Sequence, residues 1–372
     1  MSLESITDSL RDININRAEV EDPQYQPLLF HPPAGLEATN SSLSEIPTYL
    51  FRVASPKSSA TTSSTWVRPP ATRRNDNALS HEDIFTIRDP GDKKRKAALL
   101  NDHLWWQEPS DDPFVSWTSS LPFALQLIYY RHQSSRDGSP LREIRLYVVD
   151  TKKFPRGTFI RDVDLINAFV DVDPIPSGNG LKRLRRYRTW DLNFGEYLSQ
   201  GALRIEGKCQ MISGQSIFEN NRLRRIQPNF TDIDVRVPEG NPRWAKEVCR
   251  LRRVIWRGNG GPLQVAAAVP HDRMQAVGEI ADLFDHPAWR LPMAIYFAAL
   301  VGSRQELATV TTTTTLLEAL RPYYASSDIG LDRGDLKVKI VGFQSVPELE
   351  QTATIFQHIR KDYTLRKTLG FD

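Results

Sequence analysis

The chain contains little cysteine and no long hydrophobic run, and each shortage excludes a class of protein. Among 372 residues only Cys209 and Cys249 are cysteines, too few for a disulfide framework or for a zinc site built on cysteine. The longest apolar run, residues 291–302, is much shorter than the roughly 20 residues of a membrane-spanning helix. The first residues also lack the basic start and apolar core of a secretory signal. We therefore expect an intracellular protein, either cytoplasmic or nuclear.

An excess of charge of one sign is missing as well. Lysine and arginine total 48, aspartate and glutamate total 45, and the formal net charge is +3. A charge this small does not by itself call for a nucleic acid or an anionic membrane as partner. With 40% hydrophobic and 25% charged residues, the composition is that of a globular protein with room for one large domain or two ordinary ones.

The common signatures of catalysis and metal binding are absent. The seven histidines are too widely separated for the usual helical metal-ligand spacings. The chain has neither a Walker loop nor a Gly-x-Ser-x-Gly elbow. The pairs Asp162/Asp164 and Asp171/Asp173 have the spacing of metal ligands, but we interpret them as solvated loop acids. The sequence therefore predicts no metal site.

Composition and periodicity change along the chain and predict three parts. Residues 1–45 are polar and mostly acidic, which predicts a partly disordered N-terminal segment. Residues 46–230 alternate strand-like and helical patterns. Residues 231–372 show helical periodicity throughout. We expect an α+β domain followed by a C-terminal all-α domain.

Local patterns within these parts predict individual elements. Segments 46–54 and 142–150 are rich in β-branched and aromatic residues, which favours strands. Ser120 is placed to cap a helix, and Pro122 stands where a first-turn proline is tolerated. Residues 345–348 have the spacing of a capping box at the start of the last helix.

Two segments concentrate basic residues. Segment 93–96 has the composition of a nuclear import signal, and the larger segment has that of a nucleic-acid-binding surface. A solvated helix face is the simpler interpretation of both. The larger segment comprises Lys182, Arg183, Arg185, Arg186 and Arg188.

Three further segments contain polar residues in positions that need a partner. Arg52 lies in a strand whose two faces are both apolar, so its charge needs a phosphate, a carboxylate or an internal ion pair. Ser116 and Thr118 alternate along a second short strand and point to the same side of it. Glu196 follows Gly195 at the start of a third apolar segment, where an ordinary rim glutamate is the default interpretation.

Taken in chain order, these segments resemble the ADP-ribosyltransferase superfamily over about residues 46–210. The resemblance is to the branch with the signature Arg, Ser-Thr-Ser, Glu, as in enterotoxin-like and pierisin-like enzymes. The matching stretches read YLFRVASP, FVSWTSSLPFA and GEYLSQGAL. The combination is also similar to a fungal domain family of unassigned function. The resemblance implies a split β-sheet core in residues 46–230.

The resemblance also implies roles for particular residues. Glu196 would be catalytic, accepting a hydrogen bond from a ribose hydroxyl of NAD and stabilising the charge that develops when nicotinamide leaves. The implied NAD-binding residues are Arg52, Val53, Ser116, Thr118 and Phe123, with Tyr129 as an alternative to Phe123 for stacking on nicotinamide. NAD would be the substrate, no metal would be needed, and the acceptor would be a protein or a nucleic acid.

Two departures from the signature bear on activity. Trp117 replaces the middle threonine, where its side chain either fills the far side of the strand or narrows the cleft. Phe194 stands where enzymes that modify arginine carry an acid, so the expected transfer of ADP-ribose is not to arginine. Hydrolysis of NAD and a catalytically silent interaction module both remain open alternatives.

Overall fold

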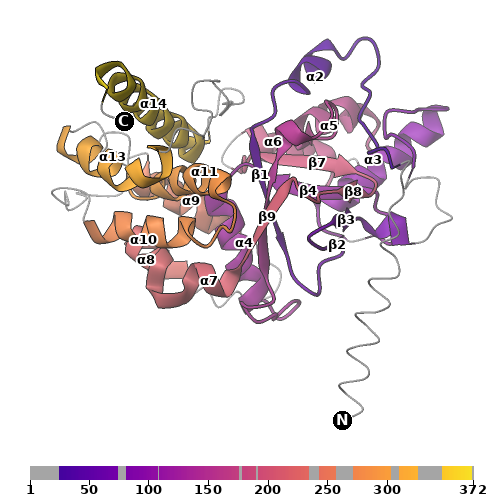
Figure 1. The fold of residues 1–372 in the computed structure, drawn as a ribbon. Coiled ribbons are helices and arrows are strands. Elements are labelled where there is room, and N and C mark those ends of the chain that lie inside the picture. The colour runs from indigo at the N-terminus through magenta and orange to yellow at the C-terminus, as the bar shows by residue number, and fades with distance from the viewer. Residues whose placement is uncertain are drawn as a thin grey trace, which may run out of the picture.

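The computed structural model describes residues 25–73, 81–107, 109–175, 178–189, 192–233, 243–256, 271–302, 310–325 and 346–370 (Figure 1). The N-terminal segment 1–45 lies largely outside this set, and its described part includes the short helix α2 (Glu37–Ser42). The fold is mixed α+β: an antiparallel sheet lies on one side of the molecule and most of the C-terminal helices lie on the other.

The main sheet has six strands in the order β6-β7-β4-β1-β5-β9. Every pairing in it is antiparallel, and β1 pairs with β5 along its whole length. The predicted strands in 46–54 and 142–150 are confirmed, each shorter at its start. The strands are β1 (Tyr49–Ala54), β4 (Phe114–Thr118), β5 (Arg145–Asp150), β6 (Ile160–Arg161), β7 (Glu196–Gln200) and β9 (Cys209–Ser213).

The two central strands, β1 and β4, share a single registered pair, Phe51 with Thr118. Strand β4 instead pairs along its full length with β7, which sets Thr118 directly opposite Glu196. Because β1 and β4 share no registered pair beyond Phe51, the sheet opens between residues 52–54 of β1 and residues 114–117 of β4.

One face of the sheet packs on a smaller sheet made of β2 (Thr61–Thr62), β3 (Trp66–Arg68) and β8 (Leu203–Arg204). Trp117 belongs to this face: it is 1% exposed, and its indole N–H donates to Ser199 Oγ at 2.9 Å. Its ring meets Phe159 edge to face. The indole therefore fills the far side of the strand, the first of the two placements considered for it.

The opposite face packs on α4 (Leu121–Gln133), which begins as predicted. The Ser120 hydroxyl accepts a hydrogen bond from the Phe123 amide, and Pro122 lies in the first turn. On its other side α4 meets α9, so it lies between the sheet and the C-terminal helices (Figure 1). These helices are α9 (Arg243–Ile255), α10 (His271–Ala281), α11 (Pro287–Ala298), α13 (Val310–Tyr324) and α14 (Pro347–Leu369).

A single hydrophobic cluster joins the sheet to the C-terminal helices. It runs from Phe51 and Val148 in the sheet through Leu125 of α4 to Ile295 of α11 and Ile355 of α14. The helices after residue 230 therefore bury their apolar faces against the N-terminal part.

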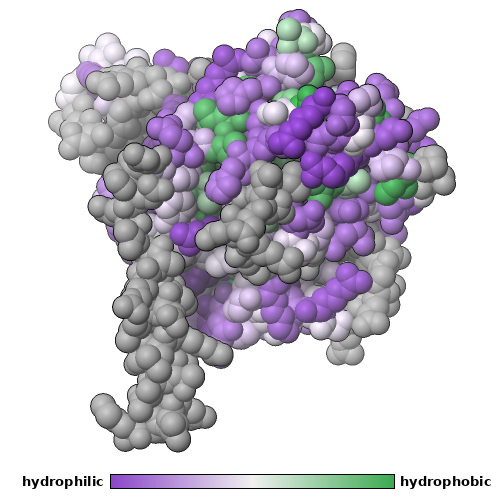
Figure 2. All heavy atoms as spheres, turned by 90° about the vertical axis from the view of Figure 1, so that its right-hand side faces the viewer, coloured by the Kyte–Doolittle hydropathy of each residue, from purple (hydrophilic) through white to green (hydrophobic). Residues whose placement is uncertain are grey.

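Some of the remaining helices pack beside the sheet, and the last of them packs on α10. They are α3 (Pro90–Leu104), α5 (Asp162–Phe169), α6 (Leu181–Thr189), α7 (Gly214–Phe218) and α8 (Arg222–Ile226). Short 3-10 turns occur at Pro70–Arg73, Thr151–Lys153, Val170–Val172, Glu219–Asn221 and Pro228–Ile233. Within the described ranges, no helix combines the length and hydrophobicity needed to cross a bilayer. Polar side chains cover most of the face shown in Figure 2, with hydrophobic residues in separate small patches.

Several charged residues that were interpreted as solvated are buried. Asp162 and Asp164 are 4% and 6% exposed in the first turn of α5, so their interpretation as solvated loop acids is wrong. Asp164 binds Arg161 and accepts a hydrogen bond from Ser42. Lys96 is 2% exposed and pairs with Glu82, so its charge is not available on the surface. Ion pairs and hydrogen bonds offset the cost of burying such charges.

Candidate functional site

A pocket opens where β1 and β4 separate. All six residues that the sequence analysis assigned to the site line it: Arg52, Val53, Ser116, Thr118, Phe123 and Glu196. The fold therefore brings together side chains from three strands and one helix that are far apart along the chain. The pocket is also lined by residues that the sequence did not single out, among them His103, Trp106, Asp112 and Arg131.

Arg52 is a buried cation surrounded by neutral oxygens. Its side chain donates to Thr62 Oγ1 at 3.0 Å, to the Ser116 carbonyl at 3.1 Å and to the Ala60 carbonyl at 3.4 Å. Among the described residues, no carboxylate forms an ion pair with it. Burial, and secondarily the charge of Arg131, lowers the pKa of Arg52 to about 9. A buried guanidinium without a counter-ion is a ready site for an anion.

Arg131 brings a second cation to the same pocket from the last turn of α4. It pairs with Asp137 at 2.8 Å and donates to Ser55 Oγ at 3.2 Å. A basic residue near a helix C-terminus is common for electrostatic reasons alone, so the sequence contained no signal for this placement.

Glu196 begins β7 after a tight turn that is held from several sides. Thr118 Oγ1 donates to the Phe194 carbonyl at 2.6 Å, and the Ser119 amide donates to the Gly195 carbonyl at 2.8 Å. Gly195 has a φ of +59°, and a Cβ atom there would lie 2.1 Å from Ser119 Oγ. Glycine adopts this φ without strain, whereas a larger residue would also have to displace the Ser119 hydroxyl; the turn directs Glu196 into the site.

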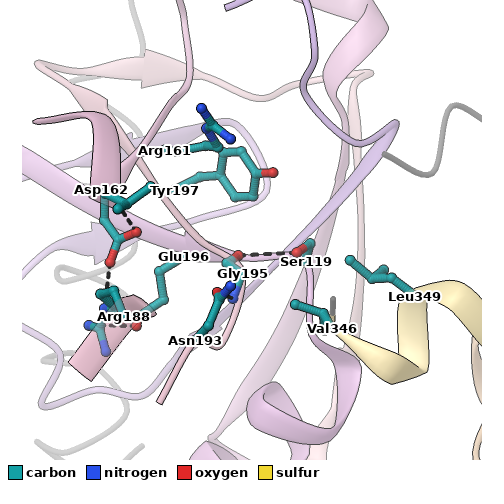
Figure 3. A pocket seen from close by; sticks show the side chains of 11 residues that line it. Ser119, Arg161, Asp162, Arg188, Asn193, Gly195, Glu196, Tyr197, Val346 and Leu349 are labelled. Carbon is teal, nitrogen blue, oxygen red and sulfur yellow. Dashed lines mark hydrogen bonds and ion pairs between the residues drawn. The ribbon is translucent and has the colours of Figure 1, made fainter. Parts of the chain in front are cut away.

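The carboxylate of Glu196 is buried against Arg188, which comes from α6 (Figure 3). The Arg188 guanidinium lies 2.5 Å from Glu196 Oε2 and 2.6 Å from Asp162 Oδ2. Burial raises the pKa of Glu196 to about 7, and the charge of Arg188 opposes that rise. Arg188 thus points inward, whereas Lys182, Arg183, Arg185 and Arg186 remain exposed on the same helix.

Glu196 lies between this pocket and a second one. The second pocket is lined by Ser119, Arg161 and Asp162 on the sheet side and by Val346 and Leu349 at the start of α14 (Figure 3). Glu196 therefore borders both pockets, although its side chain is buried.

Ser116 directs its hydroxyl to His103 and not to Arg52 or Glu196. Its Oγ lies 2.8 Å from His103 Nε2, and His103 Nδ1 lies 2.7 Å from Asp112 Oδ2. His103 belongs to the last turn of α3 and Asp112 to the segment before β4. Their spacing in the sequence matches no common motif, so the contact is visible only in three dimensions.

The two aromatic residues proposed to stack on nicotinamide, Phe123 and Tyr129, lie in different places. Phe123 stacks on Phe194 with ring centroids 4.7 Å apart, and Phe194 is 2% exposed. Tyr129, the alternative to Phe123, lies outside the pocket and packs on Phe218. Phe194 is thus part of a small apolar cluster with Val248 of α9, which explains why no acid stands there.

The C-terminal helices reach the same turn. Arg252 of α9 donates to the Asn193 carbonyl at 2.5 Å and pairs with Glu348 of α14 at 2.7 Å. Glu348 also accepts a hydrogen bond from Ser120 Oγ. Ser345, the first residue of the predicted capping box, lies outside the described residues; the N-cap residue is Val346, and Glu348 contacts Arg252 and Ser120.

Comparison with protein families gives one match: residues 45–206 match a family described as a domain of unknown function (DUF7587). The matched range contains Arg52, Ser116 and Glu196 and ends before α9. Comparison with curated proteins and with solved structures gives no match.

Proposed function

We propose that this pocket binds NAD and cleaves the bond between nicotinamide and ribose, in the manner of the ADP-ribosyltransferases that the sequence resembles. One observation carries the proposal: Arg52, a buried guanidinium with no counter-ion among the described residues, and Glu196, a buried carboxylate, line the same pocket. The first suits an anionic substrate, and the second suits a reaction that develops positive charge.

Arg52 and Arg131 are the groups that would bind the diphosphate. Arg52 carries most of the attraction for this anion, because Arg131 already pairs with Asp137, and a partly enclosed pocket makes the attraction stronger than it would be in open water. The mutual repulsion that helps to lower the pKa of Arg52 is relieved when such an anion binds. Binding energy gained there holds the rest of NAD in place for cleavage.

Glu196 supplies the chemical step. As nicotinamide leaves, the ribose acquires oxocarbenium character, and an ionised carboxylate beside it lowers the energy of the transition state. Arg188 favours the ionised form against the effect of burial. The backbone of Val53 and the ring of Phe123 line the part of the pocket that we assign to nicotinamide.

The acceptor is proposed to be a macromolecule other than an arginine side chain. Phe194 has no group that could take a proton from a guanidinium, and it is buried by α9. Helix α6 contacts Glu196 through Arg188, and its other basic residues are exposed. Their positive charge favours an acidic protein or a nucleic acid as acceptor.

The test is release of nicotinamide from NAD by the purified full chain, together with calorimetric titration of NAD. We expect turnover in the wild type, loss of turnover but not of binding in Glu196→Gln, and loss of binding in Arg52→Met. Glu206→Gln is the matched control, because Glu206 is exposed and pairs only locally with Arg204. Absence of both binding and turnover in the wild type would refute the proposal.

A catalytically silent interaction module is the second candidate function. The ion pair between Arg188 and Glu196 favours it, because that pair neutralises the carboxylate without any substrate. This candidate predicts that Arg188→Met leaves nicotinamide release at zero, whereas the enzyme hypothesis predicts a changed pH profile.

A further inference from the structure

We propose that Ser116, His103 and Asp112 form a serine nucleophile that cleaves carboxylic esters in the same pocket. This activity goes beyond the proposed cleavage of NAD, because it attacks a carbonyl carbon and does not use the carboxylate of Glu196. It rests on the hydrogen-bonded row of an acid, an imidazole and a hydroxyl that lines the pocket.

The row has the order and the distances that nucleophilic catalysis requires. Asp112 is 3% exposed, its Oδ1 accepts the Phe114 amide at 2.9 Å, and its Oδ2 lies 2.7 Å from His103 Nδ1. An ionised carboxylate only accepts hydrogen bonds, so the proton of the neutral imidazole is on Nδ1. His103 Nε2 is then left to accept the Ser116 hydroxyl at 2.8 Å, as a general base must.

Packing holds each member in place. The ring of His103 meets Phe114 edge to face with centroids 5.5 Å apart, and 10% of its side chain is exposed. Ser116 lies in the middle of β4, in register with Leu198 of β7. A nucleophile carried on a paired strand keeps its direction, and all three residues line the pocket, so a substrate can reach the hydroxyl.

The reaction balances without a cofactor. Ser116 Oγ attacks the carbonyl carbon of the ester, and its proton passes to His103 Nε2. The bond from carbon to the alcohol oxygen then breaks, and the alcohol leaves with that proton. Water next attacks the acyl-serine, gives one proton to His103, and releases the acid while Ser116 regains its proton. Arg52 lines the same pocket and donates to the Ser116 carbonyl, and we assign to it the stabilisation of the charge that forms on the ester carbonyl oxygen.

The lining of the pocket defines the class of ester. Phe123, Leu127 and Trp106 offer an apolar and aromatic surface, whereas Arg52 and Arg131 offer positive charge. A short acyl ester that also carries an anionic group satisfies both.

The experiment is covalent labelling of the full chain by a fluorophosphonate reporter, with the labelled peptide identified by mass spectrometry, and hydrolysis of p-nitrophenyl acetate. We expect the label on Ser116, and at least a 100-fold slower labelling rate in His103→Gln and in Asp112→Asn. Ser44→Ala is the control, because Ser44 is an exposed serine that does not line the pocket, and this variant is expected to leave both rates unchanged. The variant Glu196→Gln is expected to be labelled at the wild-type rate even though it no longer releases nicotinamide. A failure of one proposal can therefore be distinguished from a failure of the other.

Labelling on another residue, or no labelling at a large excess of reporter, would overturn the proposal whatever the outcome with NAD. Thermal unfolding of each variant shows whether it is folded. If Ser116→Ala does not fold, the position of the label in the wild type decides the question by itself.

Discussion

Arg252 of α9 and Glu348 of α14 form an ion pair at 2.7 Å that is almost completely buried and reaches the turn before Glu196. Their side chains are 5% and 3% exposed, and the pair also receives the hydroxyl of Ser120 at the start of α4. The C-terminal helices therefore help to place the proposed catalytic residue, although the match to a known domain family ends at residue 206.

Breaking this pair should destabilise the whole protein. Glu348→Gln leaves the Arg252 charge buried without a partner, and we expect a loss of about 3–5 kcal/mol in the free energy of unfolding. Chemical denaturation measures it. Glu350→Gln in the same first helical turn is the control and should cost less than about 1 kcal/mol. A similar loss in both variants would show that the pair has no special role.

The activity proposed for Glu196 should rise with pH. The carboxylate must be ionised, and burial raises its pKa to about 7, so nicotinamide release should increase through that pH. Arg188→Met removes the charge that opposes this rise and should move the midpoint to higher pH. A pH profile of both proteins measures the shift, and an unchanged midpoint would contradict the assignment.

The raised pKa of Glu196 should make the free energy of unfolding fall as pH rises. Its folded pKa of about 7 lies above its usual value of 4.5, so between these values the folded state binds more protons than the unfolded state. The free energy of unfolding should decrease across that window in the wild type, and less so in Glu196→Gln. Denaturation at several pH values tests the sign.

Replacing Arg52 should weaken the binding of NAD without destabilising the fold, whereas replacing an ordinary core residue destabilises the fold. Arg52→Met removes a buried charge that has no described ionic partner, so we expect the free energy of unfolding to change by less than about 1 kcal/mol or to increase. The affinity for NAD should fall by about 100-fold, since a hydrogen bond to a charged group is worth up to about 3 kcal/mol. Arg145→Met, at an exposed position of β5, should change neither quantity. A large loss of stability with unchanged affinity would make Arg52 structural.

Gly195→Ala should destabilise the protein, because the added methyl group would clash with Ser119. Its Cβ would lie 2.1 Å from Ser119 Oγ at a φ of +59°, and the turn before Glu196 would have to move. Gly207→Ala has a similar φ of +67° and open space around it, so it isolates the cost of the backbone conformation. We expect Gly195→Ala to be about 2 kcal/mol more destabilising than this control. Equal effects on thermal unfolding would mean that the turn adjusts freely.

Local chemistry made several features predictable. Ser120 and Pro122 begin α4 because a side-chain cap and a first-turn proline act within a few residues of one another. The burial of Arg52 followed from its apolar neighbours on both faces of one strand. Solvated acids at Asp162 and Asp164 were the wrong expectation, because Arg188, the partner of Asp162, and Ser42, which donates to Asp164, come close only in the folded chain.

By itself, the sequence determined the α+β order of elements, the apolar faces of the late helices, and three polar positions that needed partners. The tertiary structure decided which partners they have. His103, Arg188 and Arg252 look like ordinary surface residues in the sequence, because an ion pair or a side-chain hydrogen bond imposes no spacing along the chain. The separation of β1 from β4 likewise depends on strand register across the sheet, and that separation is what turns scattered residues into one pocket.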